Sequence, residues 1–247
     1  MDAARDLLAA KRRLVAFTGA GVSTASGIPD FRSPGGIWDR YRPVPIQEFL
    51  ASEEARRRYW KYKRETYTDF AGARPNAAHL CLARLEAEDR LLGVITQNID
   101  GLHQDAGSRR VIELHGTNRR VDCLDCGRRY PAAEVQERLN GGCEVPVCDS
   151  CRGPLKAATI SFGQALDARV LAEAFEIARS ADLLLVLGSS LVVYPAAAIP
   201  EAAASAQVPI VIINREPTPL DSLATAVVLG AVEKILPALL DSFPAGT

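Results

Sequence analysis

The sequence predicts an α/β fold in which a doubly wound parallel sheet carries two inserted segments. Short apolar runs typical of buried strands alternate with amphipathic stretches typical of helices. Several strands end in glycine or polar clusters, as expected where an open parallel sheet binds ligands at its carboxyl edge. Two segments, 36–75 and 119–156, interrupt this alternation. We therefore expect a Rossmann-like domain of residues 1–35, 76–118 and 157–247, with both insertions forming a small domain.

Each expected element follows from a local pattern of residue types. Continuous apolar runs predict strands, and apolar residues three or four positions apart predict helices. Asn76 is a residue type that caps helices. In chain order we expect helix 2–11, strand 14–17, a helical turn at 22–26, loop 27–45, helix 46–71, a helix from Asn76 to Leu85, strands 91–96 and 111–114, a short strand ending at 159–163, helix 167–179, strand 182–187, helix 195–206, strands 208–213 and 226–229, and helix 231–240.

The bulk composition favours a globular protein that stays outside membranes. Hydrophobic residues make up 48% of the 247 residues, which is enough for a sizeable core. No apolar run approaches the roughly eighteen residues of a membrane span, and the first residues do not resemble a secretion signal, so we expect a cytoplasmic location. Lys+Arg number 29 and Asp+Glu 30. Since basic residues are not in excess, the composition does not indicate direct nucleic-acid binding.

The first strand runs into the glycine turn Gly19-Ala20-Gly21, followed by Ser23. Glycines at this spacing let backbone N–H groups approach a phosphate. The same spacing also ends strands for geometric reasons, and Thr24 stands where the usual dinucleotide fingerprint has its third glycine. The turn alone therefore leaves a nucleotide site and a structural turn open.

Two further stretches around this turn have competing interpretations. Loop 27–45 is rich in glycine and proline, and we interpret it as a lid because long loops in compact domains are usually functional. The alternative is a surface loop without a functional role. The basic and aromatic run 56–64 favours an amphipathic helix with a solvated basic face over a nucleic-acid site.

Polar clusters follow two more predicted strands. Gln97-Asn98-Ile99-Asp100 comes after the strand at 91–96, and His115 comes after the strand at 111–114. Since carboxyl ends of parallel strands meet at one edge, these clusters are expected to converge on one crevice. A histidine, with an ordinary pKa of ~6.5, can act there as a general base. A structural histidine is the alternative, and the neighbouring clusters favour the base.

Five of the six cysteines fall between Cys123 and Cys151. Two Cys-x-x-Cys pairs, Cys123 with Cys126 and Cys148 with Cys151, have the spacing of knuckles that close a tetrahedral zinc site. Cys143 is a competing ligand with a poorer spacing to Cys148. Four thiolates leave no open position, so we expect one structural zinc ion rather than a catalytic one.

Together these motifs resemble the sirtuins, NAD-dependent protein-lysine deacylases, of bacterial or archaeal type. The resemblance extends from about Leu14 to the last helix. The matching blocks are Gly-Ala-Gly-Val-Ser, Gly-Ile-Pro-Asp-Phe-Arg, Thr-Gln-Asn-Ile-Asp-Gly-Leu-His, Glu-Leu-His-Gly, the paired cysteines and Gly-Ser-Ser-Leu-Val-Val-Tyr-Pro. Their order and spacing are far more specific than any block alone.

The resemblance implies roles for individual residues. NAD would be held by Gly19, Ala20, Gly21, Ser23, Asp30, Phe31, Arg32, Gln97, Asn98, Asp100, Gly188, Ser189, Asn214, Arg215, Glu216 and the backbone near Val232. An extended acyl-lysine peptide would pair by strand addition with Phe162, Gly163, Val192, Val193 and Tyr194. His115 and Asn98 would be catalytic. With His115 activating the ribose 2′-hydroxyl, the products would be free lysine, nicotinamide and O-acyl-ADP-ribose.

The chain departs from the family pattern at three positions. Gln164 stands where the family commonly has Glu, which would alter peptide contacts. Sirtuins that prefer succinyl or malonyl groups carry Tyr-x-x-Arg, and here Trp60 and Lys63 occupy those places. Since lysine lacks the bidentate fork of arginine, acetyl or longer apolar acyl groups are favoured.

Two other functional classes stay open. An NAD-dependent protein ADP-ribosyltransferase would break the same glycosidic bond with a different acceptor. A non-catalytic NAD- or peptide-binding module would not need a base beside the ribose, so the set Asn98, Asp100 and His115 argues against it. A hydride-transferring dehydrogenase is disfavoured because no proton-relay set for a small alcohol is evident.

Overall fold

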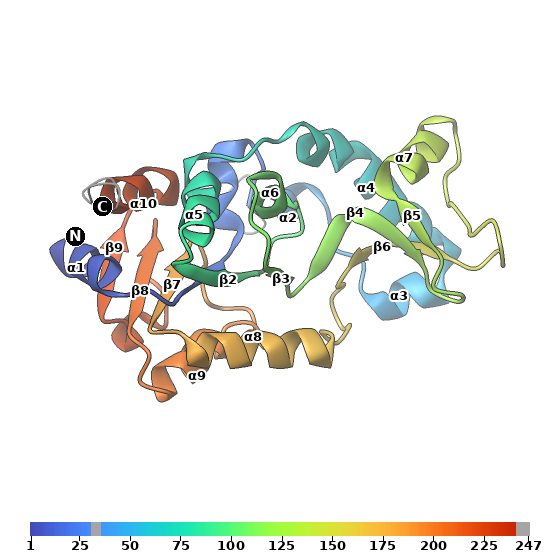
Figure 1. The fold of residues 1–247 in the computed structure, drawn as a ribbon. Coiled ribbons are helices and arrows are strands. Elements are labelled where there is room, and N and C mark those ends of the chain that lie inside the picture. The colour runs from blue at the N-terminus through green and yellow to red at the C-terminus, as the bar shows by residue number, and fades with distance from the viewer. Residues whose placement is uncertain (31–35, 241–247) are drawn as a thin grey trace.

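The central sheet of the computed structural model, which describes residues 1–30 and 36–240, has six parallel strands in the order β3-β2-β1-β7-β8-β9 (Figure 1). Its strands are β1 (Leu14–Thr18), β2 (Leu91–Thr96), β3 (Val111–Glu113), β7 (Leu183–Leu187), β8 (Ile210–Asn214) and β9 (Ala226–Leu229). β1 pairs in parallel with both β2 and β7. The chain therefore fills one half of the sheet outward from β1 and the other half outward from β7, which places a topological switch point between these two strands.

Helices cover both faces of this sheet (Figure 1). One face packs against α1 (Asp2–Ala10), α5 (Ala77–Ala87) and α10 (Val232–Leu240), and the other against α8 (Ala168–Ser180) and α9 (Ala198–Ser205). Side chains of β1 alternate between these layers, so that Leu14 and Ala16 join the first core and Val15 and Phe17 the second. The continuous apolar runs predicted from the sequence follow from this burial on both faces.

A second, antiparallel sheet of order β5-β4-β6 lies at one end of the molecule (Figure 1). Its strands are β4 (Gly116–Cys123), β5 (Arg129–Pro131) and β6 (Leu155–Thr159), and α7 (Ala132–Asn140) lies in the connection from β5 to β6. α3 (Ile46–Ala51) and α4 (Glu53–Gly72) share a hydrophobic core with it. This shared core supports the expected grouping of both insertions into one small domain, whose boundaries stay a prediction.

Local chemistry shifts three elements from their predicted bounds. The helix expected at 46–71 is broken at Ser52, which is extended and whose side chain accepts a hydrogen bond from the Ala55 N–H at 3.3 Å, so that α4 starts anew. The loop expected at 27–45 contains a short helix, α2 (Ile37–Arg40). The strand ending at Thr159 is β6, which belongs to the small sheet, so the parallel alternation resumes only at α8.

Two helical turns, η1 (Ala20–Val22) and η2 (Thr24–Ser26), stand where a helical turn is predicted after the glycines. The remaining elements are α6 (Leu102–Asp105) and η3 (Asp221–Leu223). α9 begins at Ala198 rather than at the predicted Pro195, since residues 195–197 form a turn. Among the described helices none combines the length and apolar character needed to span a bilayer.

Candidate active site

A cavity of about 990 Å³ opens at the carboxyl edge of the parallel sheet and extends to the small domain. Most predicted site residues line it: Gly19, Ala20, Gly21, Asp30, Gln97, Asn98, His115, Phe162, Gly163, Gly188, Ser189, Val192, Val193, Tyr194, Asn214, Arg215, Glu216 and Val232. Phe31 and Arg32 lie outside the described residues. Ser23 and Asp100 are buried and do not line the cavity. The predicted convergence of strand-end clusters is thus present.

The glycine turn forms the wall of this cavity above the switch point. The Gly19 N–H donates to the Leu187 carbonyl at 3.0 Å, and the Gly21 N–H donates to the Gly188 carbonyl at 2.9 Å. A Cβ on Gly19 would lie 2.7 Å from the Gly188 oxygen, and one on Gly21 would lie 2.8 Å from the Gly188 Cα. Glycine is therefore required at positions 19 and 21 by the close approach of two backbones, and Ala20 is the residue of this turn that carries a side chain, a single methyl group.

Asn98 lines the cavity, and two hydrogen bonds fix the orientation of its side-chain amide. Its Nδ2 donates to the Gly19 carbonyl and to the Ser23 Oγ, both at 3.1 Å. Because both amide hydrogens are used, the acceptor oxygen Oδ1 is the atom that Asn98 offers to a ligand. The Ser23 hydroxyl in turn donates to Asp100 Oδ2 at 2.8 Å. Ser23 and Asp100 therefore act on this site through Asn98.

Two buried histidines, not assigned to the site from the sequence, complete this network. His79 accepts the Asn76 backbone N–H at Nδ1, so its proton resides on Nε2, 3.5 Å from the Ser23 Oγ. His103 Nε2 lies 3.0 Å from the Thr18 hydroxyl. Burial lowers the pKa of His79 to about 4 and that of His103 to about 3, so both rings are neutral. The position of His79 three residues after a capping Asn was the one sequence signal for its role.

His115 lies in the same cavity with a defined tautomer. Its Nδ1 is 2.9 Å from the Gln97 carbonyl oxygen. Since a carbonyl only accepts, Nδ1 carries the proton and Nε2 carries the lone pair that a general base needs. The Ile160 N–H donates to the His115 carbonyl at 2.9 Å, which ties the histidine to the segment after β6. The arrangement can remove a proton from a hydroxyl placed at Nε2.

The far end of the cavity is built by β7, β8 and the start of α10. The Gln97 amide donates to the Ser189 hydroxyl at 2.8 Å, so the two halves of the sheet are joined across the switch point. The Asn214 amide donates to the Glu216 carbonyl at 2.8 Å, which shapes the turn after β8. This end is polar and lies beside backbone turns, as a nucleotide site requires.

The predicted peptide edge is exposed and partly engaged by the small domain. The side chains of Phe162, Val192 and Tyr194 are 49%, 51% and 60% exposed. The Ile46 N–H donates to the Phe162 carbonyl at 3.0 Å, and the Gln47 amide donates to the Gly163 carbonyl at 3.2 Å. Each of these two carbonyls already accepts one hydrogen bond, so a peptide that adds at 162–163 would share them with the small domain or pair with neighbouring backbone groups.

Gln164, which stands where the family has Glu, turns back onto its own loop. Its side-chain oxygen accepts the Ser161 N–H at 3.1 Å, and its backbone N–H donates to the Ser161 carbonyl at 3.0 Å. The residue therefore closes a turn in this structure.

The small-domain side of the cavity is lined by Tyr59, Tyr62 and Lys63 of α4, whereas Trp60 is buried in the small-domain core. Lys63 Nζ donates to Asn118 Oδ1 at 2.6 Å and lies over the rings of both tyrosines. Burial, and secondarily the charge of Lys156, lowers the pKa of Lys63 to about 7. A largely neutral amine at slightly alkaline pH is a weak partner for an acyl carboxylate.

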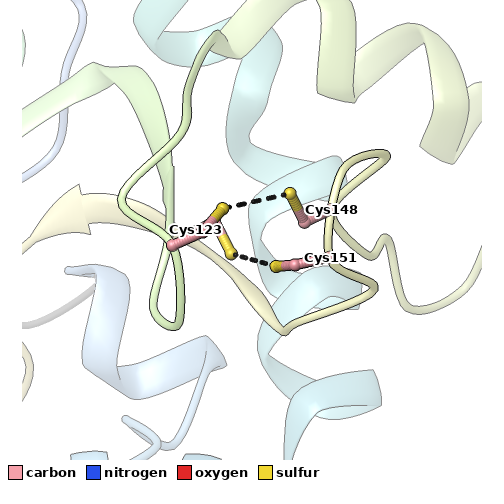
Figure 2. Close-up of side chains that lie close together, drawn as sticks. Cys123, Cys148 and Cys151 are labelled. Carbon is pink, nitrogen blue, oxygen red and sulfur yellow. Dashed lines mark hydrogen bonds between the residues drawn. The ribbon is translucent and has the colours of Figure 1, made fainter.

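The four predicted metal ligands come together in the small domain. The Sγ atoms of Cys123, Cys126, Cys148 and Cys151 all lie within 4.8 Å of one another. Figure 2 shows the sulfur atoms of Cys123, Cys148 and Cys151 turned toward a common centre. Cys143 is not part of this group. A four-sulfur cluster of this size fits a tetrahedral structural zinc ion.

Comparisons with known proteins agree with this geometry. The Sir2 family model matches residues 19–195. An NAD-dependent protein deacetylase 1 of Bradyrhizobium diazoefficiens is 46% identical over 225 residues, covering 90% of this chain and 88% of the relative. An NAD-dependent protein deacylase 2 of Archaeoglobus fulgidus is 42% identical over 239 residues, covering 96% and 94%.

A solved structure of a Sir2 protein with a peptide and NAD⁺ superposes with a TM-score of 0.88 at 38% identity. The match covers 96% of this chain and 95% of that one. The predicted resemblance and fold class are thereby confirmed. From the extent of the family match and the similarity of these relatives, the chain belongs to the Sir2 family.

Proposed function

We propose that the protein uses NAD to remove acetyl groups from lysine side chains of other proteins, releasing nicotinamide and O-acetyl-ADP-ribose. The observation that carries this proposal is the shared cavity of the glycine turn, the oriented Asn98 amide and the His115 lone pair. The names of the two relatives and of the solved structure described above support it. A cytoplasmic location is part of the proposal, since NAD and acylated proteins must both reach the cavity.

The shape of the glycine turn and the orientation of Asn98 suit NAD. The N–H groups of Gly19 and Gly21 already donate to the Leu187 and Gly188 carbonyls, so these glycines contribute close access to the phosphates, and Asn98 offers an acceptor to a ribose hydroxyl. When bound, NAD supplies a glycosidic bond that breaks to release nicotinamide. The chain positions the lysine amide oxygen against that bond and excludes water from it while nicotinamide leaves. One water molecule is consumed afterwards, when the lysine amine is released and the acetyl group stays on the ribose.

His115 then takes the proton of the ribose 2′-hydroxyl at Nε2. The Gln97 carbonyl stabilises the resulting imidazolium because it keeps accepting the Nδ1 hydrogen. Ser23, Asp100 and His79 hold Asn98 in place and stay out of contact with the reacting atoms. The zinc ion would hold the small domain together and take no part in the chemistry.

The test is a product assay with purified protein, NAD and matched acetyl-lysine and unmodified lysine peptides. Mass spectrometry would follow peptide and nucleotide products together. Equal amounts of free lysine peptide, nicotinamide and O-acetyl-ADP-ribose support the proposal. If NAD is consumed, ADP-ribose becomes attached to protein and no acetyl groups are lost, the proposed deacetylation is wrong and the transferase reaction takes its place.

A further inference from the structure

The segment 97–101 delivers Gln97, Asn98 and Ile99 to the cavity although it belongs to no helix or strand. Its start is held by the sheet, since the Gln97 N–H donates to the Thr18 carbonyl at 3.0 Å. At its end, the Asp100 side chain accepts from the Ser23 hydroxyl at 2.8 Å, and the backbone carbonyls are held by β4. A segment of this kind keeps one shape only if both ends are held, and the second anchor is therefore important for ligand binding.

Consecutive residues of β4 provide that second anchor. The Asn118 N–H donates to the Ile99 carbonyl at 2.8 Å. Next to it, Arg119 Nε donates to the Asp100 carbonyl at 3.1 Å. The guanidinium passes so close over Gly101, whose φ is +74°, that a side chain there would collide with it. Two successive carbonyls of the segment are thus held by two successive residues of one strand.

The orientation of Arg119 is itself fixed by an ion pair. Its Nη1 donates to Asp105 Oδ1 at 2.7 Å, and its Nη2 pairs with Oδ2, which gives a bidentate contact with α6. Hydrogen bonding from Arg119 lowers the pKa of Asp105, so the pair stays ionised at neutral pH. A bidentate pair fixes the plane of the guanidinium and leaves Nε aimed at the Asp100 carbonyl.

We propose that Arg119, oriented by Asp105, is a positioning residue that holds segment 97–101 in the shape that binds NAD. This inference rests on the proposed function, since it concerns the same cavity. It assigns no catalytic contact to either residue. It explains why an arginine is placed on the strand at the point where the segment turns over Gly101.

The test compares three variants with one matched control. Arg119→Met removes both contacts, Asp105→Asn removes the ionic partner with little change in shape, and the double variant removes both groups. Arg110→Met is the control, because Arg110 makes a similarly exposed ion pair with Glu173 at 3.0 Å and does not contact the segment. Calorimetric titration with NAD gives Kd without needing turnover.

We expect Arg119→Met to raise the Kd for NAD about five-fold and Asp105→Asn about two-fold, the size of one hydrogen bond and one exposed ion pair. The double variant should match Arg119→Met, because Asp105 acts only through Arg119. In turnover, KM for NAD should rise with Kd while KM for the peptide stays unchanged. High salt should weaken NAD binding less in Asp105→Asn than in the parent protein.

Two results overturn the inference: an unchanged Kd in Arg119→Met, or an equal rise in Arg110→Met. Additive effects in the double variant would remove Asp105 from the account. Thermal unfolding of all variants identifies any that are merely misfolded. If the parent protein itself fails to bind NAD, the proposed function has failed, and that outcome is distinct from the failure of this inference.

Discussion

The hydrogen bond between His115 Nδ1 and the Gln97 carbonyl decides what this histidine can do. A ring whose Nδ1 is committed as a donor presents Nε2 as an acceptor, which is the form that a base must have. Its sequence position at a strand end indicated a ligand-facing residue. The tautomer depends on a residue eighteen positions earlier and is visible only in the fold.

Lys63 gives a residue-scale prediction about acyl selectivity. Because burial lowers its pKa to about 7, Lys63 is largely neutral at pH 8.5 and charged at pH 6. Its neighbours Lys156, Tyr59 and Tyr62 supply no negative charge near neutral pH. We expect the ratio of kcat/KM for acetyl-lysine over succinyl-lysine peptides to exceed one, and to fall as pH decreases from 8.5 to 6.

Lys63→Met should remove that pH dependence of the ratio, and Lys61→Met on the exposed part of α4 should preserve it. Higher kcat/KM on succinyl-lysine than on acetyl-lysine at pH 8.5 would contradict the expected preference. Of the two positions compared with acyl-carboxylate sirtuins, Lys63 lines the cavity and Trp60 does not. The helical spacing alone could not separate them, because the core around Trp60 comes from distant strands.

At the scale of elements, the N-terminus of α5 connects a helix cap to the site. Asn76 caps the helix through the Ala78 N–H at 2.9 Å and also donates to the Val22 carbonyl at 2.8 Å. We expect Asn76→Ala to lower the free energy of unfolding by about 2 kcal/mol, because the cap is lost together with the part-buried hydrogen bonds to the Val22 carbonyl and the Ser26 hydroxyl. Urea denaturation measures it.

The matched control is Asp167→Ala, which removes a cap on α8. The Asp167 carboxylate accepts the Arg169 and Val170 N–H groups and makes an exposed ion pair with the Arg169 side chain at 3.7 Å. We expect it to cost about 1 kcal/mol. Equal losses in both variants would show that the link from Asn76 to the glycine turn contributes nothing to stability.

The zinc cluster gives a second prediction at this scale. Cys126→Ala should reduce bound zinc from one ion per chain, because the remaining three thiolates leave the tetrahedral set incomplete. Trp60 packs in the same core as Cys123 and Cys148, so its fluorescence should shift to longer wavelength on metal removal. A Trp38→Phe background isolates that signal, since the chain has two tryptophans.

Cys143→Ala is the control for this experiment and should keep its zinc and its Trp60 emission. Loss of zinc from Cys143→Ala would contradict the assignment of the four ligands. The cysteine spacing predicted this ligand set from the sequence. The spacing could not show that α3 and α4, more than fifty residues earlier in the chain, complete the core around the metal module.

Across the whole molecule, the position of the ligand-binding cavity at the carboxyl edge of the sheet was predictable, because glycines and polar residues at strand ends are a strong local signal. The break at Ser52 and the assignment of β6 to the small sheet were not, since both depend on which partner a segment meets. The same holds for Ser23 and Asp100, whose burial beneath Asn98 follows from the packing of η1 and the segment after β2.

The buried histidine pair predicts how global stability depends on pH. His79 and His103 have folded pKa values of about 4 and about 3, below the ordinary value of ~6.5. Below pH 6.5 the unfolded chain therefore binds protons that the folded chain does not. The free energy of unfolding should fall by several kcal/mol as pH drops from 6.5 toward 4, because each histidine contributes about 1.4 kcal/mol per pH unit.

Urea denaturation between pH 7 and 5 tests this, since most carboxylates stay ionised in that range. His103→Gln should flatten the dependence even if it lowers stability at pH 7. A slope equal to that of the parent protein would show that His103 does not contribute to it.

The most direct test of the proposed mechanism is product analysis of His115→Ala beside the parent protein, with NAD and an acetyl-lysine peptide in excess. We expect the rate of free-lysine formation to fall at least about 100-fold, the usual size of a lost general base. Unchanged zinc content and unfolding temperature would show that the fold is intact. Turnover close to that of the parent protein would contradict the role of His115, and with it the chemistry inferred for this cavity.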